Sequence, residues 1–330
     1  MARALYDDRS LLKVLGMRRT MFVMPRNLAG VVQAAVTDAL AAAERKRMVQ
    51  MVTGAGIDED VEGWIADVER QTLEALELLG SATANELAKR VPGLRLQISF
   101  GEGRKWAGQV GVSTRMLFLL ATEGRVVRGK PRGTWLSSLY EWAPTAKWLG
   151  SKLDRPPADI AQCELVRRYL AAYGPATARD VQWWTGWTVA TTKKALAASG
   201  AAEVALDQGE GFALSGDKNE TAAVSPWVAL LPALDTTTMG WAGRGWFLGR
   251  HAGSLFDRNG NAGPTVWADG RVVGGWAQRK SGEVVYRLLE DIGRRAEQRV
   301  GAQAARLESW LGDSRIIPRF RTPLEAELTA

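Results

Sequence analysis

The sequence of 330 residues contains a single cysteine, Cys163, and a single histidine, His251. One cysteine excludes an intrachain disulfide and a thiolate metal cluster. One histidine excludes a zinc-protease motif, and a Ser-His-Asp triad would have to use His251 itself. We expect Cys163 to pack as a small apolar side chain inside a helix and His251 to pack or hydrogen-bond in a glycine-rich loop. Most common hydrolase chemistries are therefore excluded, and we expect no metal or cofactor.

Long hydrophobic runs are also missing. No apolar run approaches the roughly 20 residues of a membrane span, and no signal-peptide pattern precedes the first predicted helix. We therefore expect no membrane partner and a cytoplasmic location, at the nucleoid if the protein binds DNA. Cations are in excess, because 43 Lys and Arg face 36 Asp and Glu and give a net charge of +7. This excess suits a polyanionic partner, although many basic proteins bind none.

A repeated pattern occupies the middle of the chain. Residues 70–91, RQTLEALELLGSATANELAKRV, and residues 165–186, LVRRYLAAYGPATARDVQWWTG, each predict a helix, a glycine stop and a second helix after x-Ala-Thr-Ala. In the first copy Thr83 and Glu86 form the pattern of a capping box, and Thr-x-x-Asp takes its place in the second. Both segments therefore read as helix, tight turn and short helix.

A third helix and a β-ribbon follow in both copies. VSTRMLFLLATEG (112–124) and TVATTKKALAASG (188–200) each predict a helix closed by glycine, and two β-prone stretches come next. Three helices followed by a β-ribbon are the winged-helix form of the helix-turn-helix. The first copy also contains an insertion at residues 93–111, where we expect an extra hairpin.

The string GRVVRGK begins at Gly124 and has the Gly-x-x-x-x-Gly-Lys spacing of a phosphate-binding P-loop. A P-loop must follow a strand and open a helix, whereas this string follows a helix. Pro131 also stands where the Ser or Thr that binds magnesium would be. We therefore interpret the string as a wing.

The first predicted wing is basic and has no acidic residue between Gly124 and Tyr140. Such a wing beside a phosphate backbone is typical of duplex binding, and Arg115 lies at the start of the preceding helix, after Ser113 and Thr114. The alternative is a solvated basic hairpin. The cations of the wing are Arg125, Arg128, Lys130 and Arg132.

The second predicted wing carries acidic residues and no Lys or Arg, which disfavours phosphate. Lys193 and Lys194 on its third helix remain candidate backbone contacts, but a scaffold or packing role is favoured for this copy. The acidic residues are Glu203, Asp207 and Glu210.

The two ends of the chain differ from the repeats. Residues 2–25 predict a helix and then a strand ending at Pro25, like the last helix and wing of a truncated winged helix, with Arg18 and Arg19 at the junction. Residues 27–70 predict long helices interrupted around residues 54–56. From about Val224 the pattern predicts a small antiparallel sheet or partial barrel with one helix. Residues 314–320 are expected to return to that sheet.

Two turns stand out in the C-terminal part. Asp269-Gly270 joins two alternating runs and predicts a type I′ hairpin. The loop 256–264, FDRNGNAGP, contains Arg258 and Asn259. It is either an ordinary turn or a hairpin tip that enters a DNA groove.

The predicted fold class is α+β and mostly helical, with tandem winged helices before a small β domain. We place the first remnant and a helical linker at 1–68 and the winged helix with the basic wing at 69–150. The second winged helix follows at 151–220, and the β-rich domain at 221–330.

The tandem repeat and the motifs MRRTMF, LLPALD and NGNAGPTVWADGRVVGGW together resemble the winged-helix DNA-binding family that includes the AlkZ and YcaQ glycosylases, and an actinobacterial branch in particular. The resemblance implies duplex DNA, alkylated or abasic, as partner, and DNA repair as context. The family's enzymes remove N7-alkylated purines, including crosslinks, with a Gln-x-Gln or Gln-x-Asp pair in the first winged helix. Neither Gln33 nor Gln97 stands in that pattern, so no catalytic residue carries over, and we expect this chain to begin after it.

The favoured hypothesis is therefore a duplex-DNA-binding protein without a recognisable catalytic motif. The alternatives are an active monofunctional, metal-free glycosylase and a winged-helix scaffold that binds other proteins.

Overall fold

The computed structural model describes residues 1–330 except 101–106, 208, 218–221 and 319, and says nothing of the Phe100 side chain. The chain forms two compact units. Unit 1 comprises Met1–Tyr169 and Thr185–Gly200, and unit 2 comprises Leu170–Trp184 and Ala201–Ala330. Within the described ranges, no helix is long and apolar enough to span a membrane. The four predicted domains stay a prediction.

Unit 1 begins with a short helix and a β-hairpin. Helix α1 (Ala2–Tyr6) precedes strands β1 (Leu11–Leu15) and β2 (Met21–Pro25), which pair antiparallel. The predicted strand ending at Pro25 is therefore confirmed, but the helix is shorter than predicted. Residues 11–15 are extended because LLKVL pairs with MFVMP across the turn at η1 (Met17–Arg19).

A helical layer follows the hairpin. The predicted interruption around Gly54–Gly56 is confirmed, because the chain leaves the helix there and re-enters at Asp60, whose side chain accepts a hydrogen bond from Gly63 N. The helices are α2 (Arg26–Val32), the π-helical turn η2 (Gln33–Thr37), α3 (Asp38–Thr53) and α4 (Val61–Leu79).

The first repeat has the predicted element order. Thr83 and Glu86 form a complete capping box at the start of α5, since each side chain accepts a hydrogen bond from the other residue's backbone N–H. The expected extra hairpin is also present on both sides of the undescribed 101–106. The elements are β3 (Ala82–Thr83), α5 (Ala84–Arg90), η3 (Pro92–Arg95), β4 (Gln97–Phe100), β5 (Gly108–Gly111), α6 (Val112–Thr122), β6 (Val126–Pro131) and β7 (Tyr140–Pro144).

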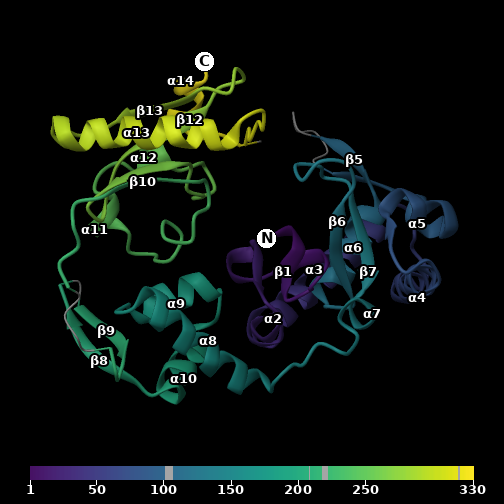
Figure 1. Ribbon diagram of the computed structural model, residues 1–330. Coiled ribbons are helices and arrows are strands. Elements are labelled where there is room, and N and C mark those ends of the chain that lie inside the picture. The colour runs from purple at the N-terminus through teal and green to yellow at the C-terminus, as the bar shows by residue number, and fades with distance from the viewer. Residues whose placement is uncertain (101–106, 208, 218–221, 319) are drawn as a thin grey trace. The chain divides into compact units, whose positions relative to one another are not determined.

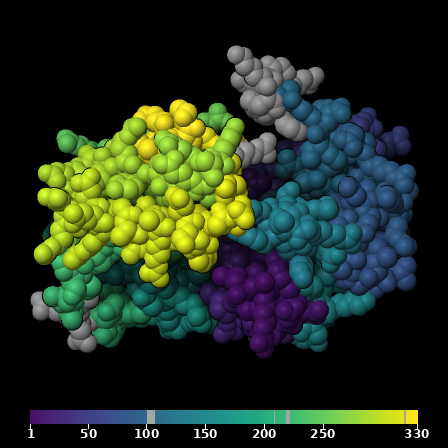
Figure 2. Space-filling view, turned by 45° about the horizontal axis from the view of Figure 1, so that its top comes forward, coloured from purple at the N-terminus to yellow at the C-terminus, as the bar shows by residue number. Residues whose placement is uncertain are grey.

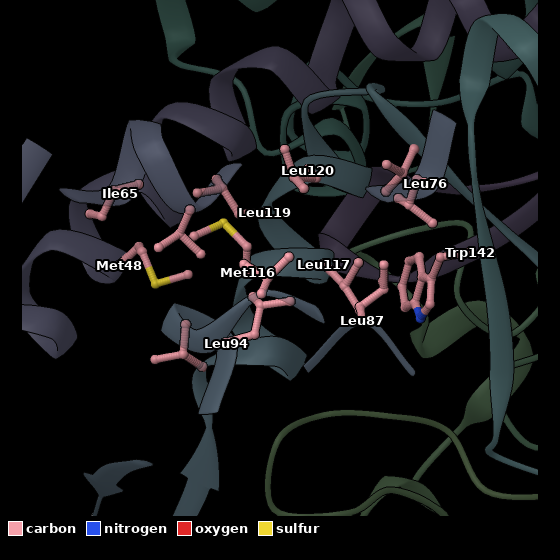
Figure 3. Packing of buried hydrophobic residues seen from close by; sticks show 14 of the residues in the cluster. Met48, Ile65, Leu76, Leu87, Leu94, Met116, Leu117, Leu119, Leu120 and Trp142 are labelled. Atoms are coloured by element: carbon pink, nitrogen blue, oxygen red, sulfur yellow. The ribbon is translucent and has the colours of Figure 1, made fainter. Parts of the chain in front are cut away.

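The core of unit 1 forms around α6 (Figure 3). Leu117 and Leu120 are fully buried, and they pack with side chains of α3, α4 and α5 and with Trp142 of β7. Strands β3, β7 and β6 form a three-stranded sheet. The apolar side of α6 therefore fixes the helix against the sheet, and its opposite side is left at the surface.

The second repeat also has its predicted elements, and they are divided between the two units. Thr177 and Asp180 exchange the expected capping bonds, because Thr177 N donates to Asp180 and Asp180 N donates to Thr177. The assignment of both repeats as winged helices stays a prediction. After α7 (Thr145–Leu149), the elements are α8 (Ala158–Tyr173), α9 (Ala178–Thr185), α10 (Val189–Ser199), β8 (Ala201–Leu206) and β9 (Gly209–Leu214).

Unit 2 contains a four-stranded antiparallel meander with helices on both faces (Figure 1). Trp267 and Val272 face α11, α12 and α14, whereas Val266 and Val273 face α13. The C-terminal residues, yellow in Figure 2, lie at the surface of this unit. The elements are β10 (Val228–Leu231), α11 (Gly245–Leu248), α12 (Ala252–Leu255), β11 (Thr265–Ala268), β12 (Arg271–Gln278), β13 (Val284–Leu288), α13 (Arg294–Leu311) and α14 (Pro323–Leu328).

The turn prediction in this unit is confirmed, and two others are wrong. Asp269 and Gly270 both have positive φ, 47° and 83°, as a type I′ turn requires. Among the described residues of unit 2, four helices accompany the sheet where one was predicted. The described residues of 314–320 form no strand, because Ile316 N donates to the Gln278 side chain and Pro318 has no N–H to pair.

Candidate nucleic-acid interface

A pocket of about 280 Å³ opens on the surface side of α6 in unit 1. Three guanidinium groups come together there, from Arg115 of α6, Arg128 of β6 and Arg19 of the η1 turn. None of the described residues that line it is Asp or Glu. The remaining lining residues are Ala84, Thr114, Leu117, Phe118, Ser138, Leu139, Tyr140 and Trp142.

Arg128 is held in this pocket by aromatic rings. It lies opposite Trp142 in the β6–β7 register, and its guanidinium carbon is 4.8 Å from the Tyr140 ring centroid and 5.1 Å from that of Trp142. Its buried Nε has no hydrogen-bond partner in the described part of the chain. Burial lowers the pKa of Arg128, although a guanidinium stays charged at neutral pH. A cation held without a carboxylate favours an anionic ligand.

Arg115 and Arg19 complete the cationic lining. Arg115 forms no ion pair within the described residues, and its buried Nε lacks a partner. Arg19 is 5.8 Å from the Phe118 ring and forms a 2.7 Å ion pair with Glu44. Its neighbour Arg18 does not line the pocket, and burial lowers the pKa of Arg18. The pocket thus contains two arginines free of carboxylates and one that is partly neutralised.

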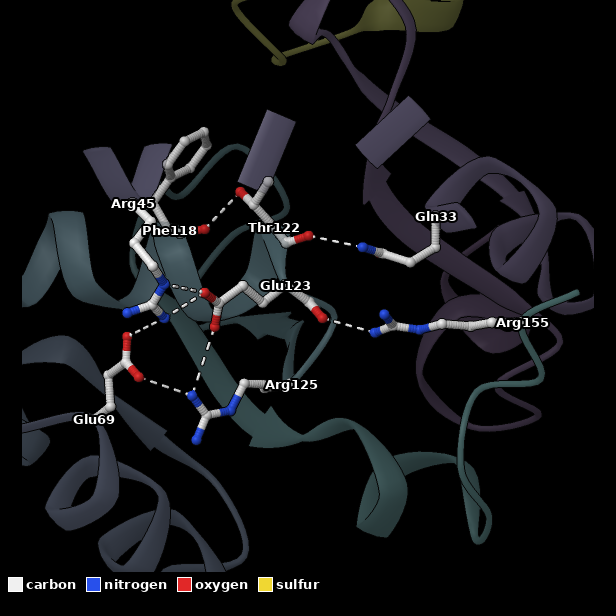
Figure 4. A network of polar contacts seen from close by, with 8 residues as sticks. All are labelled: Gln33, Arg45, Glu69, Phe118, Thr122, Glu123, Arg125 and Arg155. Carbon is white, nitrogen blue, oxygen red and sulfur yellow. Dashed lines mark hydrogen bonds and ion pairs between the residues drawn. The ribbon is translucent and has the colours of Figure 1, made fainter. Parts of the chain in front are cut away.

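Arg125 takes part in a different arrangement (Figure 4). Its guanidinium is 2.9 Å from Glu69 and 3.5 Å from Glu123, and Arg45 bonds to the same two carboxylates. The Glu69 side chain is only 6% exposed. Arg125 therefore joins the start of β6 to α4, and its charge is compensated within the protein.

Arg132 is likewise paired, and Lys130 is not. Arg132 bonds to Glu86 at 2.9 Å and to Glu141 at 3.0 Å, and these ion pairs connect the residue after β6 to α5 and β7. Hydrogen bonds from the backbone and hydroxyl of Thr83, together with Arg132, lower the pKa of Glu86 from 4.5 to about 2. Lys130 is exposed and makes no ion pair with any described residue. The four wing cations that look equivalent in sequence therefore differ in charge compensation.

The other predicted contacts lie elsewhere. Lys193 and Lys194 are exposed on α10 of unit 1, outside the pocket. Arg258 and Asn259 belong to unit 2, where Asp257 accepts hydrogen bonds from Asn259 N and from Asn261. The loop 256–264 is thus a closed turn, and its entry into a groove stays a prediction.

The residues excluded from catalysis have structural partners. Gln33 is buried and donates to Thr122 O at 2.8 Å and to Asp38 at 2.7 Å. His251 contacts Glu290 at 3.3 Å, as expected for a hydrogen-bonding histidine. Cys163 is partly exposed rather than fully buried and donates to Ala198 O. No group of three His, Cys, Asp or Glu in the described ranges is placed to hold a metal ion.

The aromatic supports of the pocket were missed by the sequence analysis. The ring of Tyr140 packs against the guanidinium of Arg128. The ammonium of Lys13 from β1 also lies 5.2 Å from the centroid of that ring. The signal was present, since YEW places two aromatic side chains on one face of a strand beside a basic strand. Pairing of β6 with β7 was needed to bring Arg128 over them.

Comparison with known proteins identifies the family. The profile described as DNA glycosylase AlkZ-like matches residues 1–310. Among solved structures, the DNA glycosylase AlkZ of Streptomyces sahachiroi is similar in fold, with a TM-score of 0.68 and 22% identity over 93% of this chain and 81% of that one. A search of curated proteins finds no match. Because the profile covers nearly the whole sequence, the chain belongs to the DNA glycosylase AlkZ-like family.

Proposed function

We propose that this protein binds double-stranded DNA through the face of unit 1 formed by α6, β6 and β7, and that it serves DNA repair. The observation that carries the proposal is the pocket in which Arg115 and Arg128 have no carboxylate partner among the described residues. A phosphate group would supply the missing anion, and arginine binds phosphate through paired N–H donors. The family and the net charge of +7 support the same partner.

The wing cations take different parts in this proposal. Arg115, Arg128 and Lys130 contact phosphates, and Arg18 and Arg19 extend the cationic surface. The main role of Arg125 and Arg132 is to position the wing through their ion pairs, and contact with DNA is secondary for both. Lys193, Lys194, Arg258 and Asn259 remain secondary candidates.

The test is duplex binding measured by fluorescence anisotropy across a salt series. Each phosphate contact contributes about 0.9 to the slope of log affinity against log salt. The double variant Arg115→Ala, Arg128→Met should therefore lower the slope by nearly 2, while methionine keeps an apolar stem against the rings. Arg306→Ala is a matched control, because Arg306 is an exposed arginine of α13 with no ion pair to a described residue. An unchanged slope in the double variant would contradict the proposed face.

A second candidate function is N-glycosidic bond hydrolysis, which the family profile over residues 1–310 favours. We propose N7-alkylated purines or crosslinks as its substrates. Release of N7-methylguanine from an alkylated duplex measures it, and a duplex with a stable abasic analogue measures lesion preference without turnover. Base release above the buffer control supports an enzyme. Binding without base release supports a DNA-binding protein that is not a glycosylase. Absence of DNA binding at physiological salt favours the alternative of a winged-helix scaffold that binds other proteins.

A further inference from the structure

The loop that joins β6 to β7 exposes three large apolar side chains. Trp135 is 65% exposed, Leu136 44% and Leu139 45%. Single apolar residues are common on protein surfaces, but a group of three on one short loop indicates an interaction site. A tryptophan in this position loses little conformational entropy on binding because it has only two side-chain torsions.

The loop is held in a defined conformation. Arg132 N donates to Leu139 O at 2.8 Å and closes its base, and Ser137 N donates to Thr134 O at 3.0 Å within it. The ion pairs of Arg132 with Glu86 and Glu141 fix the same base to the rest of unit 1. Trp135 is therefore presented to solvent by a closed loop rather than packed on the sheet.

The surroundings of the loop decide what kind of partner fits. Leu139 and Ser138 line the pocket that contains Arg115 and Arg128, so the apolar loop adjoins a cationic site without carboxylates among the described lining residues. Exposed Lys130 lies on the other side of the loop in sequence. Cations beside an exposed aromatic ring are the combination that binds nucleic acid with accessible bases, because phosphates meet the cations and a base stacks on the ring. A fully paired duplex offers the phosphates but no exposed base face on which the ring could stack.

We propose that Trp135, flanked by Leu136 and Leu139, stacks on a base that local distortion of the DNA has exposed. The inference rests on the proposed function, because the neighbouring phosphates must occupy the arginine pocket. It adds a preference for bulged, mismatched or base-lacking DNA over intact duplex. Apolar side chains inserted at a weakened base step act in this way in other nucleic-acid complexes.

The experiment compares anisotropy titrations of a paired duplex and of the same duplex with a single-nucleotide bulge of 2-aminopurine. Stacking on an aromatic side chain contributes about 5- to 150-fold to affinity. Trp135→Ala should lose that factor on the bulged duplex and less than twofold on the paired one, and Trp135→Phe should recover part of it. Quenching of the 2-aminopurine emission should accompany wild-type binding and be absent with Trp135→Ala. Trp310→Ala, which removes a 77% exposed tryptophan from α13, should leave both titrations unchanged.

The outcomes separate the two proposals. If wild-type protein binds both duplexes with a steep salt slope and Trp135→Ala binds the bulge equally well, base stacking is refuted and duplex binding stands. Equal losses on both duplexes also refute stacking, since Trp135 is then a general contact. If wild-type protein binds neither duplex, the proposed function fails and this inference fails with it. Because Trp135 is mostly exposed, its alanine variant should keep the melting temperature of the wild type.

Discussion

Glu69 is a buried acidic residue of unit 1 whose removal should measurably lower stability. Its carboxylate lies 2.7 Å from Arg45 and 2.9 Å from Arg125, and the side chain is 6% exposed (Figure 4). Hydrogen bonds to charged groups contribute about 1.5–3 kcal/mol each. Glu69→Ala removes two of them, but both arginines are 40% exposed and keep Glu123, so solvent and Glu123 offset about half. We expect a loss of about 1.5–3 kcal/mol in the free energy of unfolding.

Urea unfolding followed by circular dichroism measures this loss, and calorimetry should show a fall of about 3–12 °C in the melting temperature of unit 1. Glu74→Ala is the matched control, since Glu74 is a 62% exposed carboxylate on the same helix, paired with Arg70. That variant should change the unfolding free energy by less than about 0.5 kcal/mol. Equal effects of the two variants would refute the assignment of stability to the buried network.

A double-mutant cycle of Glu69→Ala with Arg125→Ala should give a coupling energy of about 1 kcal/mol. Additive losses in the two single variants would also contradict a stabilising ion pair between Glu69 and Arg125.

Three further predictions concern packing, capping and pH. Leu117→Ala leaves a cavity in the α6 core and should cost about 2–5 kcal/mol in urea unfolding, whereas a smaller loss would mean that the core collapses around the site. Asp180→Ala leaves the N–H groups of Ala242 and Gly243 without their acceptor and should cost about 2–4 kcal/mol in unit 2, and an unaffected melting temperature would contradict this. Glu86 has a pKa of about 2 when folded against 4.5 ordinarily, so its stabilising contribution is full above pH 4.5 and is lost as pH falls toward 2. Glu86→Gln should therefore weaken the dependence of the urea midpoint on pH between pH 5 and 3. A dependence as steep as that of the wild type would refute the contribution assigned to Glu86.

Local signals in the sequence predicted much of the fold. The Thr83 and Thr177 caps, the hairpin in the insertion and the Asp269-Gly270 turn each depend on neighbouring residues and are seen in the structure. Two of the predictions that proved wrong concern segments whose form depends on distant partners. Residues 11–15 become a strand by pairing with residues 21–25, and the segment after α13 is held by the side chain of Gln278 from β12. Neither partner is visible from local pattern alone.

The candidate site was predictable only in part for the same reason. Sequence reasoning identified Arg115 and the four wing cations, but it treated them as one basic surface. Arg125 is paired with Glu69, which lies 56 residues earlier, and Arg132 with Glu86, which lies 46 residues earlier. Compensation of a charge depends on the tertiary structure, so a count of cations overestimates the charge available to a ligand.

The way in which an arginine is held determines whether its charge remains available to a ligand. A carboxylate fixes a guanidinium by neutralising it, so a phosphate must compete with that carboxylate, as it would at Arg125 and Arg132. An aromatic ring fixes the guanidinium through its face and its apolar contact area and leaves the full positive charge in place. Arg128 is held by Tyr140 and Trp142, and such a cation is both pre-positioned and uncompensated. Pre-positioning lowers the entropy lost on binding, and the missing counter-charge leaves the electrostatic gain to the ligand. In the proposed complex the aromatic residues of β7 therefore support anion binding without contacting the anion, and DNA phosphate is expected first at the pocket beside α6 rather than equally at every cation of the basic stretch.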